Sequence, residues 1–318
     1  MWHQTLEKIN PLTTPLKAAA RWGADKNSLT LINNGINLVY RFEHSGKGAY
    51  LRITHPLIRP RSELDSALDF QCHLFKCGVP VCQPIFSQEG HYIEDIHQDE
   101  LLFLSHVNEQ VTGEIITFTH ENKHAYITWG KSLAKLHSAA HHYQPKEHHF
   151  KDWTHLWNET ATYLNLEDSF IKDEYQAIDS WIKTFPQTRD NFGLTHADHR
   201  TGNVLYDGEE VYLIDFDEPI YHWFLSDIAR PLLELSPLTF STWHQKFDWY
   251  LEGYQSIRPL SKDDLKNISW FSRMKALDIY LWCKNNWKDK SSPGGRDTNQ
   301  WLKELRSLIL NPIFLNVS

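Results

Sequence analysis

Cysteine is scarce in this sequence, and long apolar runs are absent. Only 4 cysteines occur among 318 residues, and no two of them stand at the Cys-x-x-Cys spacing that zinc sites commonly use. No apolar stretch approaches the roughly 20 residues that a membrane-spanning helix requires. The first residues also lack the basic region and apolar stretch of a secretory signal. We therefore expect a cytoplasmic protein with reduced thiols and no membrane partner.

Basic residues are also fewer than acidic ones. Lys and Arg number 32 against 40 Asp and Glu, a formal net charge of −8, which argues against nucleic acid as a partner. Aromatic residues are plentiful, with 16 Phe, 13 Tyr and 13 Trp, and they argue against extended disorder. An acidic, Trp-rich chain favours a cationic small-molecule ligand, although core packing explains most of the tryptophans equally well. The oligomeric state stays unknown at this point.

Alternating apolar residues and turn signals dominate the first third of the chain. A short helix is expected at 16–22, and a longer one at 62–77, where apolar residues recur at helical spacing. The expected strands lie near 29–32, 38–42, 49–53, 83–86, 91–96 and 101–105. Residues 1–107 are therefore predicted to form a small, antiparallel, β-rich lobe with one helix.

Helical periodicity takes over after Asn108. The expected helices lie at 121–142, 152–164, 167–184, 240–256, 262–288 and 298–310. A single β-hairpin is expected to interrupt them, because apolar strands at 204–206 and 211–214 flank Asp207-Gly208. Residues 108–318 are therefore predicted to form a larger, mainly helical lobe, with a hinge near 105–108. The fold class is α+β with two lobes.

Three polar residues gather around this hairpin. Asn203 comes directly before its first strand and Asp215 directly after its second, so we expect the two to emerge side by side at the open end. Asp198 lies on the loop that enters the same end. Two carboxylates and an amide therefore converge, and such oxygen ligands suit a divalent cation together with a separate base.

Phosphoryl transfer requires such parts, because the charge of the transferred group must be neutralised while an alcohol is aligned behind it. Asp198 would accept and orient the hydroxyl, and Asn203 and Asp215 would hold Mg²⁺ on the phosphates of a nucleotide. Arg200, two residues after the base, could reach the transferred phosphate. A lone Asp in a loop is usually a turn former, so only the whole set supports this interpretation.

The same segment resembles the aminoglycoside phosphotransferase and protein-kinase-like superfamily. His196-x-Asp198-x-x-x-x-Asn203, followed by Ile214-Asp215-Phe216-Asp217, is similar to the catalytic loop and metal aspartate of that family. The resemblance implies a protein-kinase-like fold, ATP and Mg²⁺ as cofactors, and a small-molecule hydroxyl as the acceptor. It is most specific over 194–229.

The resemblance also covers residues that support the catalytic loop. The segment 223–229 is similar to the helix whose aspartate braces that loop in the family, which implies a structural role for Asp227 and for His196 within the loop. A helix N-cap is the alternative for Asp227, because Ser226-Asp227 precedes Ile228-Ala229-Arg230.

The resemblance is looser in the first lobe. Asn34, Gly35 and Asn37 lie in a turn similar to the Gly-x-Asn-x-x-Tyr turn of the family, which implies contact with the nucleotide phosphates. The resemblance also implies that adenine lies against backbone groups near Ser105 and Val107.

The strand cation and its usual partner depart from the pattern of the family. Arg52 stands where the family's strand carries a phosphate-binding lysine, so the charge is kept and its shape is changed. Ala67 occupies the helix position where the partner glutamate usually sits, and Glu63, one turn earlier on the same face, is a candidate substitute.

These observations predict an ATP- and Mg²⁺-dependent phosphotransferase with an alcohol group as acceptor, such as an amino alcohol or aminoglycoside. A non-catalytic nucleotide-binding pseudokinase is the alternative that Arg52 and Ala67 favour, and the retention of Asp198 with both metal ligands opposes it. A protein Ser/Thr kinase is the third possibility, but the short span from Asp215 to Asp227 leaves little room for an activation segment. The sequence does not identify the acceptor.

Overall fold

The structure is a computed structural model that describes residues 8–119, 121–145, 149–234, 240–287 and 297–310. The described residues fall into two compact units. The first unit holds those up to Thr112 together with a short stretch that starts at Gln144. The second holds those from Gly113 to Tyr143 and from Phe150 onward. No helix of these described segments is long and apolar enough to span a bilayer.

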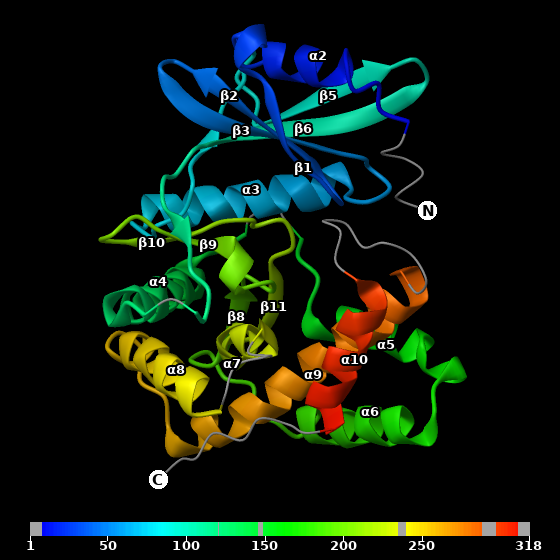
Figure 1. Ribbon diagram of the computed structural model, residues 1–318, viewed down its shortest axis with the longest axis vertical. Helices are drawn as coiled ribbons and strands as arrows, with labels where there is room; N and C mark the ends of the chain where they lie inside the picture. Colours follow the sequence, from blue (N-terminus) through cyan, green and yellow to red (C-terminus); the bar gives the residue numbers. More distant parts are fainter. Residues whose placement is uncertain (1–7, 120, 146–148, 235–239, 288–296, 311–318) are drawn as a thin grey trace. The chain divides into compact units, whose positions relative to one another are not determined.

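An antiparallel sheet forms the centre of the first unit (Figure 1). Its strands are β1 (Thr30–Asn34), β2 (Leu38–His44), β3 (Lys47–Thr54), β4 (Pro84–Ile85), β5 (Ile93–Gln98) and β6 (Leu101–Glu109). They run in the order β1-β2-β3-β6-β4, and β5 also pairs with β6. The strands predicted from alternation are therefore confirmed. In β2, for example, Leu38, Tyr40 and Phe42 share one buried face.

Two α-helices cover opposite faces of this sheet, α2 (Thr14–Ala20) and α3 (Arg61–Lys76). Phe103 of β6 packs in one core cluster with Ala18 of α2. Leu104, the next residue, packs in another with Leu64 and Leu68 of α3. Successive side chains of a strand point to opposite faces, so the sheet lies between the two helices, as Figure 1 shows.

Strand β6 is longer than the sequence indicates, because it continues to Glu109. Ser105 lies between β3 and β5, and Val107 lies between β3 and β4. Both residues are fully buried, and neighbouring strands flank their backbone groups on both sides. The segment 105–108, predicted as a hinge, therefore lies within β6, and the first unit continues to Thr112. The predicted adenine contacts of Ser105 and Val107 stay predictions. The polar residues that suggested the end of the strand are instead buried within the sheet.

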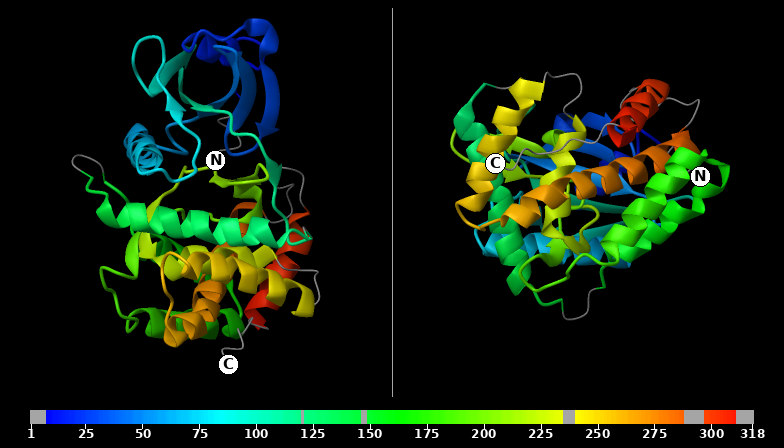
Figure 2. Two further views of the ribbon diagram at one scale, coloured as in Figure 1. Left: turned by 90° about the vertical axis from the view of Figure 1, so that its left-hand side faces the viewer. Right: turned by 90° about the horizontal axis from the view of Figure 1, so that it is seen from below.

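Helices make up most of the second unit. They are α4 (Lys123–His142), α5 (Trp153–Thr162), α6 (Ser169–Ile182), α7 (Phe224–Ala229), α8 (Phe240–Gln255), α9 (Lys262–Trp287) and α10 (Thr298–Leu310). The six helices predicted from periodicity are confirmed. Figure 2 shows α4 and α8 side by side. They approach so closely that a Cβ at Gly130 would collide with the carbonyl oxygen of Tyr250, and one at Gly253 with that of Ile127.

The strands of the second unit form two small antiparallel sheets. The predicted hairpin is confirmed as β9 (Val204–Tyr206) and β10 (Val211–Leu213), and β7 (Glu114–Ile115) extends it. A second pair joins β8 (Phe192–Thr195) to β11 (Ile220–Trp223). The expectation that this hairpin alone interrupts the helices is therefore wrong. Strands of four residues are too short for periodicity to reveal them, and their partners lie far away in the sequence.

Candidate active site

The predicted catalytic loop joins the two small sheets of the second unit. Strand β8 ends at Thr195 and β9 begins at Val204, so residues 196–203 connect them. The backbone N–H of Ile214 donates to the carbonyl oxygen of Asn203 at 3.0 Å. Asn203 therefore lies beside the residue that precedes Asp215, and the expected convergence of these two residues at the end of the hairpin is confirmed.

Asp198 lies at the centre of a charged network. Its Oδ2 accepts hydrogen bonds from Arg200 Nε and Asn203 Nδ2, both at 3.0 Å, and its Oδ1 accepts one from Arg230 Nε, also at 3.0 Å. Partial burial would raise the pKa of Asp198, but Arg230 and Arg200 outweigh it and lower this pKa below its usual range. The side chain is still 44% exposed. Asp198 is therefore an ionised carboxylate that an external hydroxyl can reach.

The amide orientation of Asn203 follows from its partners. Its Nδ2 donates to the carbonyl oxygen of Asp198 at 2.9 Å and to the carboxylate Oδ2 of the same residue at 3.0 Å. Both partners can only accept, so the nitrogen must face Asp198 and Oδ1 must face away. Within the part of the chain that the structure describes, no donor reaches Oδ1, which leaves it available as an oxygen ligand.

Arg200 and Arg230 share two carboxylates, those of Asp198 and Glu234. Nη1 of Arg200 lies 3.9 Å from Glu234 Oε1, and Nη1 of Arg230 lies 3.8 Å from the same oxygen. Glu234 also accepts the backbone N–H of Thr201 at 2.9 Å. The four charges alternate around a ring and balance, which makes their burial tolerable. Arg200 thus binds Asp198, and its contact with a transferred phosphate stays a prediction.

Asp227 is bonded to the start of the catalytic loop. Its Oδ2 accepts the backbone N–H of His196 at 2.7 Å, and its Oδ1 accepts that of Ala197 at 2.9 Å. Asp227 lies inside α7, whose N-cap is Trp223 without a side-chain cap. The N-cap alternative is therefore wrong, because the helix begins four residues earlier than an N-cap at Asp227 would require.

A buried histidine completes the surroundings of Asp227. His137 of α4 lies between Asp227 Oδ2 at 3.1 Å and the hydroxyl of Tyr254 at 2.8 Å. Burial lowers the pKa of His137, so its ring is neutral, donates through Nε2 to Asp227 and accepts the Tyr254 O–H at Nδ1. The pKa of Asp227 is about 2, because the bonds from His137 outweigh the opposite effect of burial. Asp227 is therefore an ionised, acceptor-only anchor.

Two residues of the site adopt left-handed backbone. Ala197 has φ of 67° and Asp215 has φ of 70°, a conformation that costs a residue with a Cβ on the order of 1–2 kcal/mol. His196 Nε2 donates to the carbonyl oxygen of Ile214 at 2.9 Å, and Asp227 holds the N–H of Ala197. These bonds hold both residues in place, so His196 links the loop to the residue before Asp215.

The donor set near the hairpin fits a divalent metal ion. Asn203 offers a carbonyl oxygen whose direction is fixed, and Asp215 offers a carboxylate on the neighbouring strand end. Hard cations such as Mg²⁺ prefer oxygen ligands of this kind and complete their shell with water and phosphate oxygens. These two residues would hold the ion against the phosphates of a nucleotide.

A pocket of the second unit adjoins the catalytic loop. Its lining includes Ala197, the residue before Asp198, together with Trp153 and Trp157 of α5. Lys275 and Asp278 of α9 line it as well. The loop that carries Asp198 therefore contributes one residue, Ala197, to the wall of a partly aromatic pocket.

The residues predicted to bind nucleotide phosphates lie in the first unit. Asn34 ends β1 and Asn37 precedes β2, and the N–H of Gly35 donates to the carbonyl oxygen of Asn37 at 3.2 Å, which closes a tight turn. Arg52 lies on β3, where its register partners are Val39 of β2 and His106 of β6. The phosphate contacts of these residues stay predictions.

Helix α3 has no carboxylate at the position that the family pattern suggests. Ala67 is almost fully buried, with 2% of its surface exposed. Glu63 lies in the first turn of the same helix and is half-buried. The substitution of Glu63 for the usual partner of the strand cation stays a prediction.

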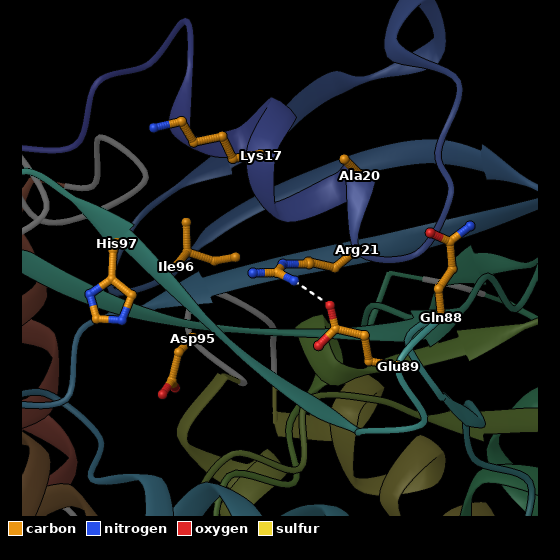
Figure 3. Close-up of a pocket in the computed structure, with 8 residues that line it drawn as sticks. All are labelled: Lys17, Ala20, Arg21, Gln88, Glu89, Asp95, Ile96 and His97. Atoms are coloured by element: carbon orange, nitrogen blue, oxygen red, sulfur yellow. Dashed lines mark hydrogen bonds and ion pairs between the residues drawn. The ribbon is translucent and has the colours of Figure 1, made fainter.

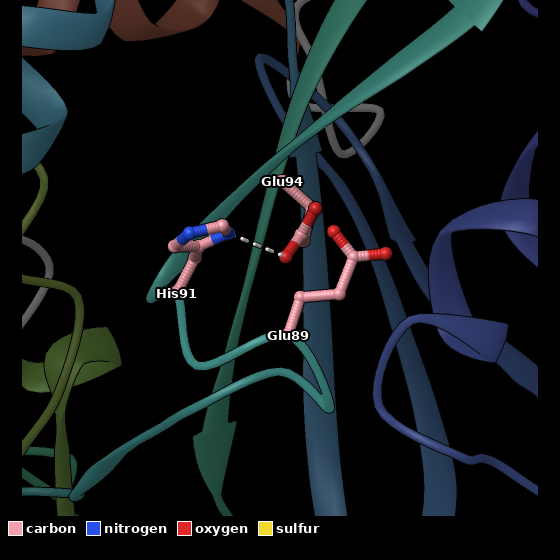
Figure 4. Close-up of side chains that lie close together, drawn as sticks. All are labelled: Glu89, His91 and Glu94. Atoms are coloured by element: carbon pink, nitrogen blue, oxygen red, sulfur yellow. Dashed lines mark hydrogen bonds and ion pairs between the residues drawn. The ribbon is translucent and has the colours of Figure 1, made fainter.

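Two other features of the first unit lie apart from the predicted site residues. A surface pocket between α2 and β5 is lined by Lys17, Arg21, Glu89 and His97 among others, and the ion pair of Arg21 with Glu89 lies in its wall (Figure 3). Glu89, His91 and Glu94 also bring their ligand atoms within 4.8 Å of one another (Figure 4). His91 Nδ1 lies 3.3 Å from Glu94 Oε1. The hydroxyl of Ser87 donates a hydrogen bond to the same oxygen.

Sequence reasoning missed Arg230, Glu234 and His137. Arg230 follows the recognised 223–229 segment directly, and Glu234 stands four residues later, a spacing that places the two on one side of a helical turn. His137 lies in a helix that periodicity did predict. No local signal shows which distant carboxylate each of them meets.

Comparison with known proteins agrees with this geometry. The chain matches the phosphotransferase enzyme family over residues 28–260. The amicoumacin kinase of Bacillus subtilis (strain 168) is 28% identical over 293 residues, which cover 87% of this chain and 86% of that protein. The homoserine kinase of Mesorhizobium japonicum is 25% identical over 276 residues, which cover 83% of each.

Solved structures show the same fold. An amicoumacin kinase in complex with AMP-PNP, Ca²⁺ and Ami superposes with a TM-score of 0.87 at 23% identity, over 99% of this chain and 98% of that one. A microcompartment-associated aminopropanol kinase gives a TM-score of 0.75 at 19% identity, over 92% and 94% of the two chains. The predicted protein-kinase-like α+β fold is confirmed. The chain belongs to the phosphotransferase enzyme family and is a kinase that uses ATP and a divalent metal ion to phosphorylate a hydroxyl of a small molecule.

Proposed function

We propose that Asp198 aligns the acceptor hydroxyl of this kinase and that Asn203 and Asp215 hold the metal ion, which we take to be Mg²⁺. The network at Asp198 supports this assignment most strongly. Arg200, Arg230 and Asn203 fix its carboxylate from three directions, and 44% of the side chain is exposed. A carboxylate held in this way is preorganised to accept one further hydrogen bond.

The transfer step follows from this geometry. The acceptor hydroxyl donates a hydrogen bond to Asp198, and its oxygen forms a bond to the γ-phosphorus. The bond from that phosphorus to the bridging oxygen of ADP breaks, and its electron pair leaves with ADP. The hydroxyl proton passes to Asp198 and then to solvent. Because the pKa of Asp198 lies below its usual range, it is a weak base and acts chiefly by positioning the hydroxyl.

A metal ion at Asn203 and Asp215 would neutralise charge on the nucleotide phosphates. The left-handed backbone at Asp215 sets the direction in which its carboxylate leaves the strand end. The bond from His196 to the Ile214 carbonyl holds that backbone in place. In the first unit, Asn34, Gly35, Asn37 and Arg52 are proposed to contact the nucleotide, since their turn and strand resemble the phosphate-binding elements of the family.

The acceptor is proposed to carry a cationic amine, and the pocket beside Ala197 is proposed to bind it. Two tryptophans and the carboxylate of Asp278 line this pocket, and such groups attract ammonium ions. The net charge of −8 supports the same class of acceptor. A cytoplasmic location is proposed with it, because the reaction consumes ATP.

The experiment measures ADP release and the mass of the acceptor for a panel of amino alcohols and aminoglycosides. A product heavier by about 80 Da is expected, the mass of one transferred phosphoryl group. Asp198→Asn should lower kcat on the order of 10²-fold or more while the affinity for ATP stays the same. Asp173→Asn, an exposed aspartate of α6, is the matched control and should behave as the wild type. Unchanged kcat in Asp198→Asn contradicts the assignment.

A further inference from the structure

The pocket beside the catalytic loop contains an ion pair. Lys275 Nζ lies 3.1 Å from Asp278 Oδ2, and both residues line the pocket from α9. About a quarter of each side chain is exposed, 26% for Lys275 and 24% for Asp278. Two opposite charges therefore stand next to each other on the wall that a bound acceptor would face.

Each member of this pair keeps unused hydrogen-bonding capacity. Asp278 accepts Thr160 Oγ1 on Oδ1 at 2.9 Å and Lys275 on Oδ2. A carboxylate offers about four acceptor sites, so two remain. The ammonium of Lys275 has three N–H donors, and one of them binds Asp278. Among the described residues Lys275 has no other hydrogen-bond partner, so two donors remain. The pair can therefore hold one cationic and one anionic group at the same time.

Neutral donors lie in the same lining. His222 is buried, and burial lowers its pKa to about 3, so the ring is neutral. Its Nδ1 accepts the backbone N–H of Trp223 at 2.9 Å, which leaves the proton on Nε2 as a donor. Ser226 adds a hydroxyl to the lining. The donors of the pocket therefore exceed what a purely cationic ligand would need.

We propose that Lys275 and Asp278 select an acceptor that carries both an ammonium group and a carboxylate, in addition to the hydroxyl that is phosphorylated. The ammonium of the acceptor binds Asp278 and its carboxylate binds Lys275. A ligand with an ammonium alone would leave Lys275 facing a like charge across Asp278, whereas a zwitterion gives each group of the pair an opposite charge. This inference rests on the proposed function, since it assumes that the acceptor occupies this pocket.

The test uses two sets of three compounds that share one hydroxyl chain. Homoserine carries both charges, 3-amino-1-propanol lacks the carboxylate, and 4-hydroxybutyrate lacks the ammonium. Serine, ethanolamine and 3-hydroxypropionate repeat the comparison one methylene shorter. We expect kcat/KM for the zwitterion of at least one set to exceed that of both its analogues by about tenfold or more, because unpaired pocket charges penalise a ligand that lacks a partner for them.

Substitutions assign the selectivity to the pair. Lys275→Met should lower kcat/KM for the zwitterion about tenfold and should raise, or at least not lower, that for the matching amino alcohol, because the like charge is removed. Asp278→Asn should lower both. Lys266→Met is the control, because Lys266 forms the same kind of pair with Asp263 at 2.9 Å on the same helix and does not line the pocket. KM for ATP and the melting temperature should stay at wild-type values in all three variants.

The outcomes separate this inference from the proposed function. If the amino alcohols react as well as the zwitterions, or if only aminated compounds without an anionic group such as spectinomycin react, this inference is overturned and the proposed function stands. Equal losses for the zwitterion and the amino alcohol in Lys275→Met also overturn it. If the protein binds ATP and phosphorylates no aminated alcohol, the proposed acceptor class and this inference fail together.

Discussion

Arg230 holds the carboxylate of Asp198 on the side opposite to Asn203. Its Nε lies 3.0 Å and its Nη2 lies 2.9 Å from Asp198 Oδ1, and only 7% of the Arg230 side chain is exposed. Asn203 and Arg200 both bind Oδ2. Each oxygen of Asp198 therefore has its own fixed donors, and the plane of the carboxylate is set before any acceptor arrives.

The first prediction concerns this contact. Arg230→Gln should lower kcat about tenfold to a hundredfold, because the carboxylate loses one of its fixed donors, and KM for ATP should stay near the wild-type value. Arg230→Lys should restore part of kcat, because the lysine ammonium supplies the positive charge but not the two parallel N–H donors of the planar guanidinium. Steady-state kinetics and thermal unfolding of both variants provide the check. If activity falls only in proportion to the folded fraction, Arg230 has no positioning role.

The second prediction concerns Asp215, the proposed metal ligand. Asp215→Ala should abolish turnover or raise the Mg²⁺ concentration needed for half-maximal activity by about tenfold or more, because phosphate charge is left without its counter-ion. Titration of ATP in the presence and absence of Mg²⁺ measures the effect. Asp248→Ala removes an exposed carboxylate of α8 and is the control. The metal lies elsewhere if the Mg²⁺ requirement of Asp215→Ala equals that of the wild type.

The third prediction concerns Asp227. Asp227→Ala leaves the N–H groups of His196 and Ala197 and the ring of His137 without their acceptor in a buried place, and should lower the free energy of unfolding by about 3 kcal/mol or more. Activity per folded molecule should fall as well, because the start of the loop loses its anchor. Urea unfolding and active-site titration separate the two effects. A loss of stability with full specific activity would leave Asp227 without influence on the loop.

The fourth prediction concerns Arg52. Arg52→Ala should weaken ATP binding by about 1–3 kcal/mol, the range for a lost hydrogen bond to a charged group. Arg52→Lys should restore only part of the affinity, since an ammonium cannot fork onto two phosphate oxygens. Calorimetric titration with magnesium-ATP measures both variants. Arg61→Ala, which removes an exposed arginine paired with Asp95 in the same unit, is the control. Wild-type affinity in Arg52→Ala would remove Arg52 from the nucleotide site.

The fifth prediction concerns the acid stability of the second unit. Burial lowers the pKa values of His199 and His222 to about 3, against 6.5 for an ordinary histidine. Between these values the unfolded chain binds a proton at each position and the folded protein does not. Stability should therefore fall as the pH drops below about 6.5, by about 1.4 kcal/mol per pH unit for each histidine.

Urea unfolding between pH 7.5 and 5 checks this slope. His222→Gln removes one of the two titrating rings. It should therefore reduce the dependence of the unfolding free energy on pH by about 1.4 kcal/mol per pH unit, whatever its effect on absolute stability. His155→Gln replaces an exposed histidine and should leave the slope unchanged. A wild-type stability that is flat between about pH 6.5 and 5 would contradict the neutral, buried state of these rings.

Local sequence patterns determined much of this protein. Six of the helices of the second unit follow from apolar residues at helical spacing, and the hairpin follows from Asp207-Gly208 between two apolar strands. A hairpin of fixed register brings its flanking residues together, so the convergence of Asn203 and Asp215 could also be predicted. The family motif around Asp198 is a set of residue types at fixed spacing. It could therefore be recognised in the sequence without knowledge of the tertiary structure.

Tertiary structure alone decided which distant groups meet. Strands β8 and β11 are too short to signal themselves, and their pairing holds the two ends of 196–219 together. The bonds of Arg230 to Asp198, of His137 to Asp227 and of Thr160 to Asp278 join residues that lie 32, 90 and 118 positions apart. Such partners are chosen by the need to neutralise buried charge and satisfy buried donors, which depends on how helices pack and leaves no periodic trace in the chain.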